Sequence, residues 1–309
     1  MDITSYLLGK QAGGGGGGGT PTKGAVFSEL DADGFPTRAD IYGLTEIPNT
    51  YMLVNSGSGS YPVLMNIKDV VFHSTVTQIN SSSFSYLSKL QNIDLSNVTT
   101  FAGSSQFMGC SSLTNIQLND NLKIISQQCF KSCTNLELSN LPSSLTNVNQ
   151  EGFSFCSNLA LTELPSSLTT LGTGAFYSCA KLAITQIPDS ITNIPSGAFY
   201  GCSSIKKLSM DKVTAIYGNG STQTGFGNCS GLKQVWIGSA ITSNGFGRYA
   251  FYGCTNLEKM YINLPRATVE SFTNYQYAFM FNTSKTGIIV CNDDEGFIDK
   301  ATFDAQVIE

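Results

Sequence analysis

The stretch Phe107-Met108-Gly109-Cys110-Ser111-Ser112-Leu113 sets the pattern of the chain, because its phenylalanine, cysteine and leucine return at a fixed spacing. Six more copies, with leucine or isoleucine at the last position, begin at Phe130, Phe153, Phe176, Phe199, Phe226 and Phe251. Four successive cysteine-to-cysteine steps are 23 residues long, and the last two are 27 and 25. Such a period predicts a solenoid, in which each coil buries its apolar face only by stacking on its neighbours.

Degenerate copies of this unit flank the seven complete ones. Phe84-Ser85-Tyr86-Leu87 has leucine at the cysteine position, and Phe279-Met280-Phe281-Asn282 has asparagine there. Atypical units are expected at both ends of a repeat array, because the outermost coils each have one face without a neighbouring coil. The array is therefore predicted to cover residues 76–282.

Apolar residues inside each unit follow the spacing of Leu232, Val235 and Ile237, which predicts a short strand that stacks in parallel with its copies. Leu113, Ile116 and Leu118 have the same spacing. Three units instead move the middle apolar residue one place earlier, and they contain the triplets Leu136-Leu138-Leu141, Leu159-Leu161-Leu164 and Leu182-Ile184-Ile187. In those units the strand is expected to begin elsewhere or to carry a bulge.

These repeated residues resemble the BspA-type leucine-rich repeat of bacteria, which implies a leucine-rich-repeat solenoid of stacked parallel short strands with turns or short helical segments. The departures are the phase change, insertions around Tyr217–Thr224 and Ser243–Arg248, and the loss of cysteine in both terminal copies. The unit from Cys156, together with Tyr6-Leu7-Leu8-Gly9-Lys10 before a glycine run, is also similar to repeat proteins encoded by prophages of gut Firmicutes.

The segments outside the array predict an N-terminal peptide on a linker and two caps. Residues 1–23 contain the heptaglycine Gly13–Gly19, which is typical of a flexible linker. Residues 24–75 should form the N-terminal cap, with strand-like runs at Tyr51–Val54, Tyr61–Met65 and Val70–Phe72. Residues 283–309 should form the C-terminal cap, from a strand at Gly287–Val290 and near-helical apolar spacing over Phe297–Ile308.

The sequence disfavours nucleic acid as a partner and disfavours insertion into a membrane. The net charge is −5, and the 17 lysine and arginine residues form no run of the kind that binds phosphate backbones. No segment approaches the roughly 18 consecutive apolar residues of a membrane-spanning helix. The first residues carry Asp2 where a secretory signal peptide has positive charge, so we expect no ordinary signal peptide.

Candidate catalytic and metal-binding residues are each better explained by structural roles. Seven cysteines occupy one equivalent position, which predicts an inward column of free thiols rather than disulfides or zinc ligands. His73, the single histidine, would have to serve any histidine-dependent mechanism, and it lies near the cap junction. The acidic runs at Asp31 and Asp33 and at Asp293-Asp294-Glu295 lack the spaced ligands of a calcium loop. We therefore expect no enzyme, no cofactor and no metal.

The position seven residues after each repeat cysteine should point outward, because it lies between two buried strand residues. Through the array this outward column contains Asp94, Gln117, Asn140, Glu163, Gln186, Ser209, Trp236 and Tyr261. Two places earlier in the last three of these coils stand Lys207, Gln234 and Lys259. Exposed aromatic rings beside polar and basic groups are typical of recognition patches. The alternative is that the C-terminal cap folds over the two rings.

The function expected from these features is non-enzymatic recognition or adhesion. The partner would be a protein or a glycan on the surface of another cell, and Trp236, Tyr261, Lys207, Gln234 and Lys259 would be the ligand-binding residues. The prophage resemblance implies a virion or tail-associated protein, and a bacterial cell-surface adhesin is the main competitor. A polysaccharide hydrolase, which needs only a suitably placed carboxylate pair and no sequence motif, and a purely structural spacer are the alternatives.

Overall fold

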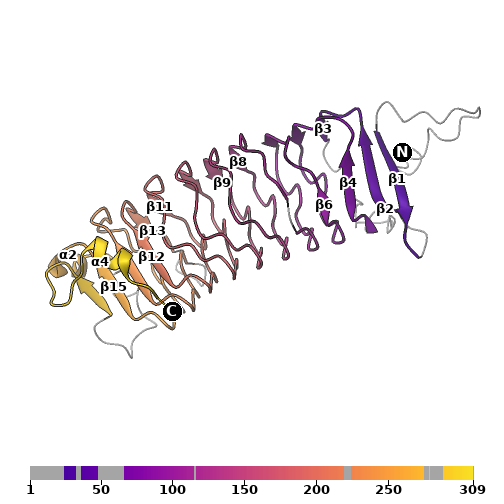
Figure 1. The fold of residues 1–309 in the computed structure, drawn as a ribbon. Helices are drawn as coiled ribbons and strands as arrows, with labels where there is room; N and C mark the ends of the chain where they lie inside the picture. Colours follow the sequence, from indigo (N-terminus) through magenta and orange to yellow (C-terminus); the bar gives the residue numbers. More distant parts are fainter. Residues whose placement is uncertain are drawn as a thin grey trace, which may run out of the picture.

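The chain forms an elongated stack of coils (Figure 1). The computed structural model describes residues 24–32, 36–47, 66–114, 116–218, 224–274 and 288–308, together with Ala278. The predicted linker, the copy at Phe279–Asn282 and the strand-like runs Tyr51–Val54 and Tyr61–Met65 lie outside these residues.

Each coil has two extended edges with a turn between them. The first edge follows the repeat cysteine, and the second edge lies before the phenylalanine of the next repeat. Strands on the first edge form one sheet at each end of the stack. The N-terminal sheet has the order β1-β2-β4-β6, with β1 (Gly24–Leu30), β2 (Pro36–Tyr42), β4 (Asp69–Phe72) and β6 (Asn92–Ile93). The C-terminal sheet has the order β12-β14-β15-β16, with β12 (Lys207–Met210), β14 (Gln234–Ile237), β15 (Lys259–Ile262) and β16 (Ile289–Cys291). All of these pairs are parallel except β1 with β2.

The second edge consists of two-residue parallel strands. They are β3 (Glu46–Ile47), β5 (Gln78–Ile79), β7 (Thr100–Phe101), β8 (Ile124–Ile125), β9 (Asn147–Val148), β10 (Thr170–Leu171), β11 (Asn193–Ile194) and β13 (Ala215–Ile216). In each, the second residue is buried. Among the described residues, two short helices lie near the C-terminal end, α2 (Arg266–Glu270) after the repeat that contains Cys254 and α4 (Lys300–Ala305) after β16.

The strand predicted on the first edge is absent from the central coils. Thr114 and residues 116–118 form no strand, although Leu113, Ile116 and Leu118 have the regular spacing. The three repeats whose middle apolar residue comes one place early also have no strand on this edge. In those three repeats two adjacent residues, such as Ser139 and Asn140, both face solvent, so the strict alternation that a ladder needs is lost. The spacing was a sound guide at β12, β14 and β15.

Side-chain hydroxyls link the central coils where the first-edge ladder is absent. The residue after the repeat cysteine donates to the backbone carbonyl 23 residues earlier, as Ser111 does to Ser88, Thr134 to Ser111 and Ser157 to Thr134. A backbone N–H donates to the same carbonyl in one of these turns, where Asn158 N–H bonds to Thr134 at 3.2 Å, so the hydroxyl bonds add to the backbone contacts between coils. The high content of serine and threonine thus has a structural use beyond solubility.

A column of stacked phenylalanine rings runs through the core. Neighbouring rings have centroids 5.3–5.7 Å apart and lie within 9° of parallel. Its members are fully buried, and they are Phe84, Phe107, Phe130, Phe153, Phe176, Phe199, Phe226 and Phe251. The repeated phenylalanine is therefore the residue that carries packing from one coil to the next.

The repeat cysteines form a second buried column that is bonded to the first. Each thiol donates to the carbonyl of the phenylalanine in the preceding coil, as Cys156 does to Phe130 at 3.0 Å and Cys179 to Phe153 at 3.1 Å. The other five bonds measure 3.0–3.2 Å. Serine could also donate here, but its more polar hydroxyl costs more to bury. All nine cysteines are free and buried, and the seven repeat cysteines form the inward column that the sequence predicts.

We expect the thiols to be unreactive in the folded protein. Burial raises the pKa of Cys133, Cys156 and Cys179 well above the usual value, and raises that of Cys291 to about 11. Because the thiolate is the reactive form, titration with a thiol reagent at pH 8 should modify almost none of the nine cysteines until denaturant is added. Rapid reaction of most of them under native conditions would contradict this assignment.

Candidate functional site

Successive residues of the outward column predicted from the sequence pair with each other in the C-terminal coils. Gln186 bridges to Ser209, Ser209 pairs with Trp236, and Trp236 pairs with Tyr261. The column therefore follows the first edge from coil to coil. In the central coils its side chains are exposed, and they are Asp94, Gln117, Asn140, Glu163 and Gln186.

The C-terminal segment covers the aromatic end of this column. Trp236 is only 2% exposed and Tyr261 only 6% exposed. Phe303 of α4 lies 5.9 Å from the Trp236 ring and 6.0 Å from the Tyr261 ring, and Phe297 packs beside both. The Trp236 indole N–H donates to Asp211 at 2.9 Å. The two residues pair on adjacent strands as expected, but their rings form a contact with the C-terminal segment, because two phenylalanines of that segment remove them from solvent.

The three polar residues beside the rings differ in how far they are buried. The Lys207 ammonium lies 4.6 Å from the centre of the Phe303 ring and donates to the carbonyls of Asp304 at 3.0 Å and Gln306 at 2.8 Å. Burial lowers the pKa of Lys207. Gln234 is half-buried, and its Oε1 is buried without a hydrogen-bond partner among the described residues. Lys259 is exposed.

A hollow of about 620 Å³ opens next to Lys207 on the same edge. On the solenoid side it is lined by Ala183, Ile184, Thr185, Gln186, Ser204, Lys206, Lys207 and Ser209. On the other side it is lined by Asp304, Gln306 and Ile308. Apart from Lys207, the sequence did not single out these residues as ligand-binding, because the two walls lie about a hundred residues apart in the chain.

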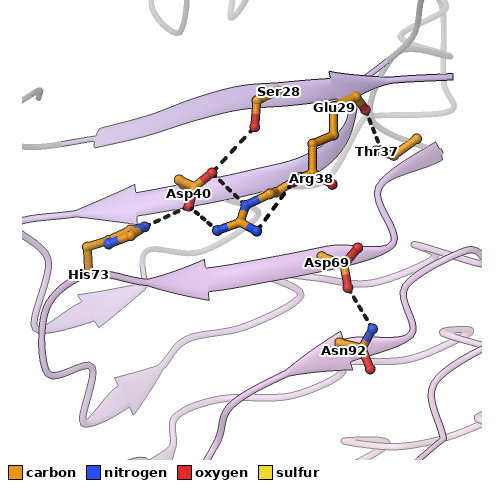
Figure 2. A network of polar contacts seen from close by, with 8 residues as sticks. All are labelled: Ser28, Glu29, Thr37, Arg38, Asp40, Asp69, His73 and Asn92. Carbon is orange, nitrogen blue, oxygen red and sulfur yellow. Dashed lines mark hydrogen bonds and ion pairs between the residues drawn. The ribbon is translucent and has the colours of Figure 1, made fainter.

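A polar network lies on the outward face of the first edge at the N-terminal end (Figure 2). Asp40 on β2 accepts hydrogen bonds from Arg38, at 2.9 and 3.0 Å, and contacts His73 Nε2 at 2.6 Å. The Tyr42 and His73 rings stack with centroids 4.3 Å apart. His73 thus ties the end of β4 to β2. This arrangement gives the single histidine a structural role.

We expect Asp40→Asn to lower the free energy of unfolding at pH 7 by about 2 kcal/mol, because a charge-assisted pair is lost and Arg38 stays part-buried. Hydrogen bonds from Arg38 hold the pKa of Asp40 below its usual value, against the opposing effect of burial. Its contribution is therefore complete above the unfolded pKa of about 3.9 and disappears as the pH falls through the folded value.

Urea unfolding of both proteins between pH 2 and 7 measures this contribution. Wild type and variant should converge at the acid end. A difference that stays constant over the whole range would show that the Asp40 charge is not responsible.

The acidic run near the C-terminus is also used structurally. Asp294 forms an ion pair with Arg266, and Asp293 accepts from the Arg266 backbone N–H at 2.8 Å. Within the described residues no cluster of histidine, cysteine, aspartate and glutamate could hold a metal ion. Asp31 accepts from Asn66 at 2.8 Å, whereas Asp33 lies outside the described residues. No helix in the described part of the chain is long and apolar enough to cross a membrane.

Several solved bacterial structures are similar to this chain. A leucine-rich cell surface protein of Faecalibacterium prausnitzii is 19% identical, and the match covers 84% of this chain and 99% of that one with a TM-score of 0.39. A leucine-rich repeat protein of Bacteroides ovatus is 18% identical, with 81% and 89% covered and a TM-score of 0.47. The leucine-rich repeat protein of T. pallidum is 24% identical, with 82% and 93% covered and a TM-score of 0.43. No curated protein matches.

The sequence itself matches a repeat family over most of its length. The model of the BspA type leucine rich repeat region matches in six copies, over residues 57–183, 138–222 and 221–305. These ranges contain all seven complete copies of the phenylalanine and cysteine unit and the stacked coils that they build. The chain therefore belongs to the BspA-type leucine-rich repeat family.

Proposed function

We propose that this protein is a non-enzymatic recognition module that binds a protein or a glycan of a bacterial surface through the outward face of the first edge. One observation carries the proposal. In the central coils the outward column presents an exposed polar side chain at each repeat, from Asp94 to Gln186. A solenoid offers such a surface at regular intervals, which suits an extended partner.

The composition of this surface supports binding by hydrogen bonds more than by net charge. Charged residues make up 13% of the chain, and the column mixes amides with single carboxylates such as Glu163. Polar groups of this kind set orientation and specificity for proteins and for sugars. A purely structural spacer would need no particular residues at these exposed positions.

The setting that we propose is the cell surface, in keeping with the family, whose members are typically cell-surface proteins. A virion or tail-associated role follows from the resemblance to prophage-encoded repeats and is the second setting. Both settings put the same first-edge surface in contact with another cell.

A hydrolase is disfavoured by the groups around the hollow beside Lys207. Glycoside hydrolysis uses two carboxyl groups on opposite sides of the bond that is cleaved. Among the described residues that line the hollow, Asp304 is the single carboxylate, and Lys300 binds it. Incubation with bacterial polysaccharides should therefore release no new reducing ends.

The binding test uses fluorescently labelled protein and a panel of bacterial cells, with binding measured by flow cytometry. Saturable binding is expected, and prior treatment of the cells with protease or with periodate identifies the partner as protein or glycan. Gln117→Arg and Glu163→Arg should each weaken binding about tenfold or more, since each places a bulky cation on the proposed contact surface.

Matched controls lie on the second edge of neighbouring coils. Thr100→Arg and Thr170→Arg introduce the same side chain at exposed positions and should leave binding unchanged. Equal effects of all four substitutions, or no saturable binding to any cell, would overturn the proposal.

A further inference from the structure

We propose that the hollow beside Lys207 binds an anionic glycan, a hydroxyl-rich chain that bears carboxylate or phosphate groups. This inference rests on the proposed recognition role and assigns a ligand class to one part of the first edge. The hollow measures about 620 Å³, which lies within the roughly 300–1,000 Å³ typical of small-ligand sites. That volume suits a few sugar units of a longer chain.

Charge gives the first argument for an anion. Lys206 and Lys207 line the hollow together with one carboxylate, Asp304. The Asp304 carboxylate is bound by Lys300, which also approaches Asp211 at 3.5 Å. Lys207 is held by two uncharged carbonyls, so neither lysine of the hollow has a carboxylate hydrogen-bonded to it among the described contacts. Among the described residues around the hollow, positive charge is thus in excess, in a chain whose net charge is −5.

Uncharged polar groups give the argument for a hydroxyl-rich ligand. Thr185, Gln186 and Ser204 add two hydroxyls and an amide to the lining. Gln306, on the opposite wall, adds a second amide. Hydroxyls and amides both donate and accept hydrogen bonds, so this lining can bind the hydroxyl groups of a sugar chain.

Apolar side chains are a minority of the described residues in the lining, which argues against a lipid or an apolar peptide. They are Ala183, Ile184 and Ile308, and no aromatic ring is among the described residues that line the hollow. Lys206 is the exposed member of the lysine pair, whereas Lys207 also holds the end of α4. Lys206 is therefore the residue that can be changed without loosening the cap.

The experiment measures binding of defined oligomers to the full chain by titration calorimetry. The probes are tetragalacturonate and a glycerol phosphate tetramer, with maltotetraose as the neutral sugar and tetraglutamate as the acidic peptide. At least one of the two anionic hydroxylated probes should bind, and which one binds tells carboxylate from phosphate. Lys206→Gln should weaken that binding about tenfold and make it less sensitive to salt.

A matched variant separates this site from general attraction between charges. Lys123→Gln removes an exposed lysine beside β8 on the second edge, with the same change in net charge, and should leave the affinity unchanged. Amide NMR signals of Gln186 and Ser204 should shift on binding in wild type, and these shifts should shrink in Lys206→Gln.

The inference is overturned if neither anionic probe binds, if maltotetraose or tetraglutamate binds as tightly, or if Lys206→Gln and Lys123→Gln have the same effect. Its failure is distinct from failure of the recognition role. Cell binding that depends on Gln117 and Glu163 would then persist without any affinity for the anionic probes.

Discussion

We expect the Trp236→Ala protein to lose about 3–5 kcal/mol of unfolding free energy, the usual cost of removing a large buried aromatic side chain. Trp236 forms a hydrophobic cluster with Tyr261, Val290 and Phe303 that is separate from the main core. Its removal would take away one of the two rings of the sheet, Trp236 and Tyr261, against which Phe303 of α4 packs. The C-terminal segment should therefore detach before the coils unfold.

Tryptophan fluorescence tests this burial directly, because Trp236 is the single tryptophan of the chain. Emission of the wild type should be blue-shifted and protected from acrylamide, and should shift to the red at a lower urea concentration than the loss of circular dichroism. Tyr252→Ala is the control for the substitution, because that ring is 42% exposed and its loss should cost under about 1 kcal/mol. Red-shifted, readily quenched native emission would favour the exposed-patch alternative.

Repetition explains why the fold was predictable from sequence. A buried position in a solenoid recurs at every coil, so Phe153 and Cys156 are identified by their copies rather than by any local propensity. The same argument fixes the direction of the outward column, and the pairing of Trp236 with Tyr261 confirms the predicted register. Periodicity is thus informative about every contact between equivalent residues.

Contacts between residues that do not repeat could not be predicted in this way. Phe303 belongs to a segment without copies, and nothing in its sequence states which face of the stack it covers. The hollow beside Lys206 has the same origin, because Gln306 reaches it from about one hundred residues away. His73 and Asp40 are likewise 33 residues apart and share no repeat position. Packing of unique segments decides these sites.

The absence of first-edge strands in the central coils is accompanied by a local change in the apolar spacing, but that change alone does not say which structure results. The displacement of Leu138 relative to Ile116 was visible as a change of phase, and either a bulge or a displaced strand could follow from it. What the sequence did not reveal is that the hydroxyls of Ser111, Thr134 and Ser157 bond to the preceding coil.

The phenylalanine column leads to the second large effect. Phe153 is stacked between Phe130 at 5.5 Å and Phe176 at 5.6 Å, and it is fully buried. Phe153→Ala should cost about 3–5 kcal/mol, because a cavity opens between two coils that cannot close around it. In a nearest-neighbour array such a cavity also weakens the coupling between the two halves of the stack.

Phe155→Ala is a matched control two residues away in the same coil. That ring is 42% exposed and contacts Tyr177 on the surface, so its loss should cost under about 1 kcal/mol. Urea unfolding followed by hydrogen exchange should show the two halves of Phe153→Ala opening separately, with a lower dependence on urea, whereas Phe155→Ala keeps the wild-type transition. A single transition of unchanged slope, displaced by less than about 1.5 kcal/mol, would mean that the hydroxyl and thiol bonds between coils hold the stack together without the rings.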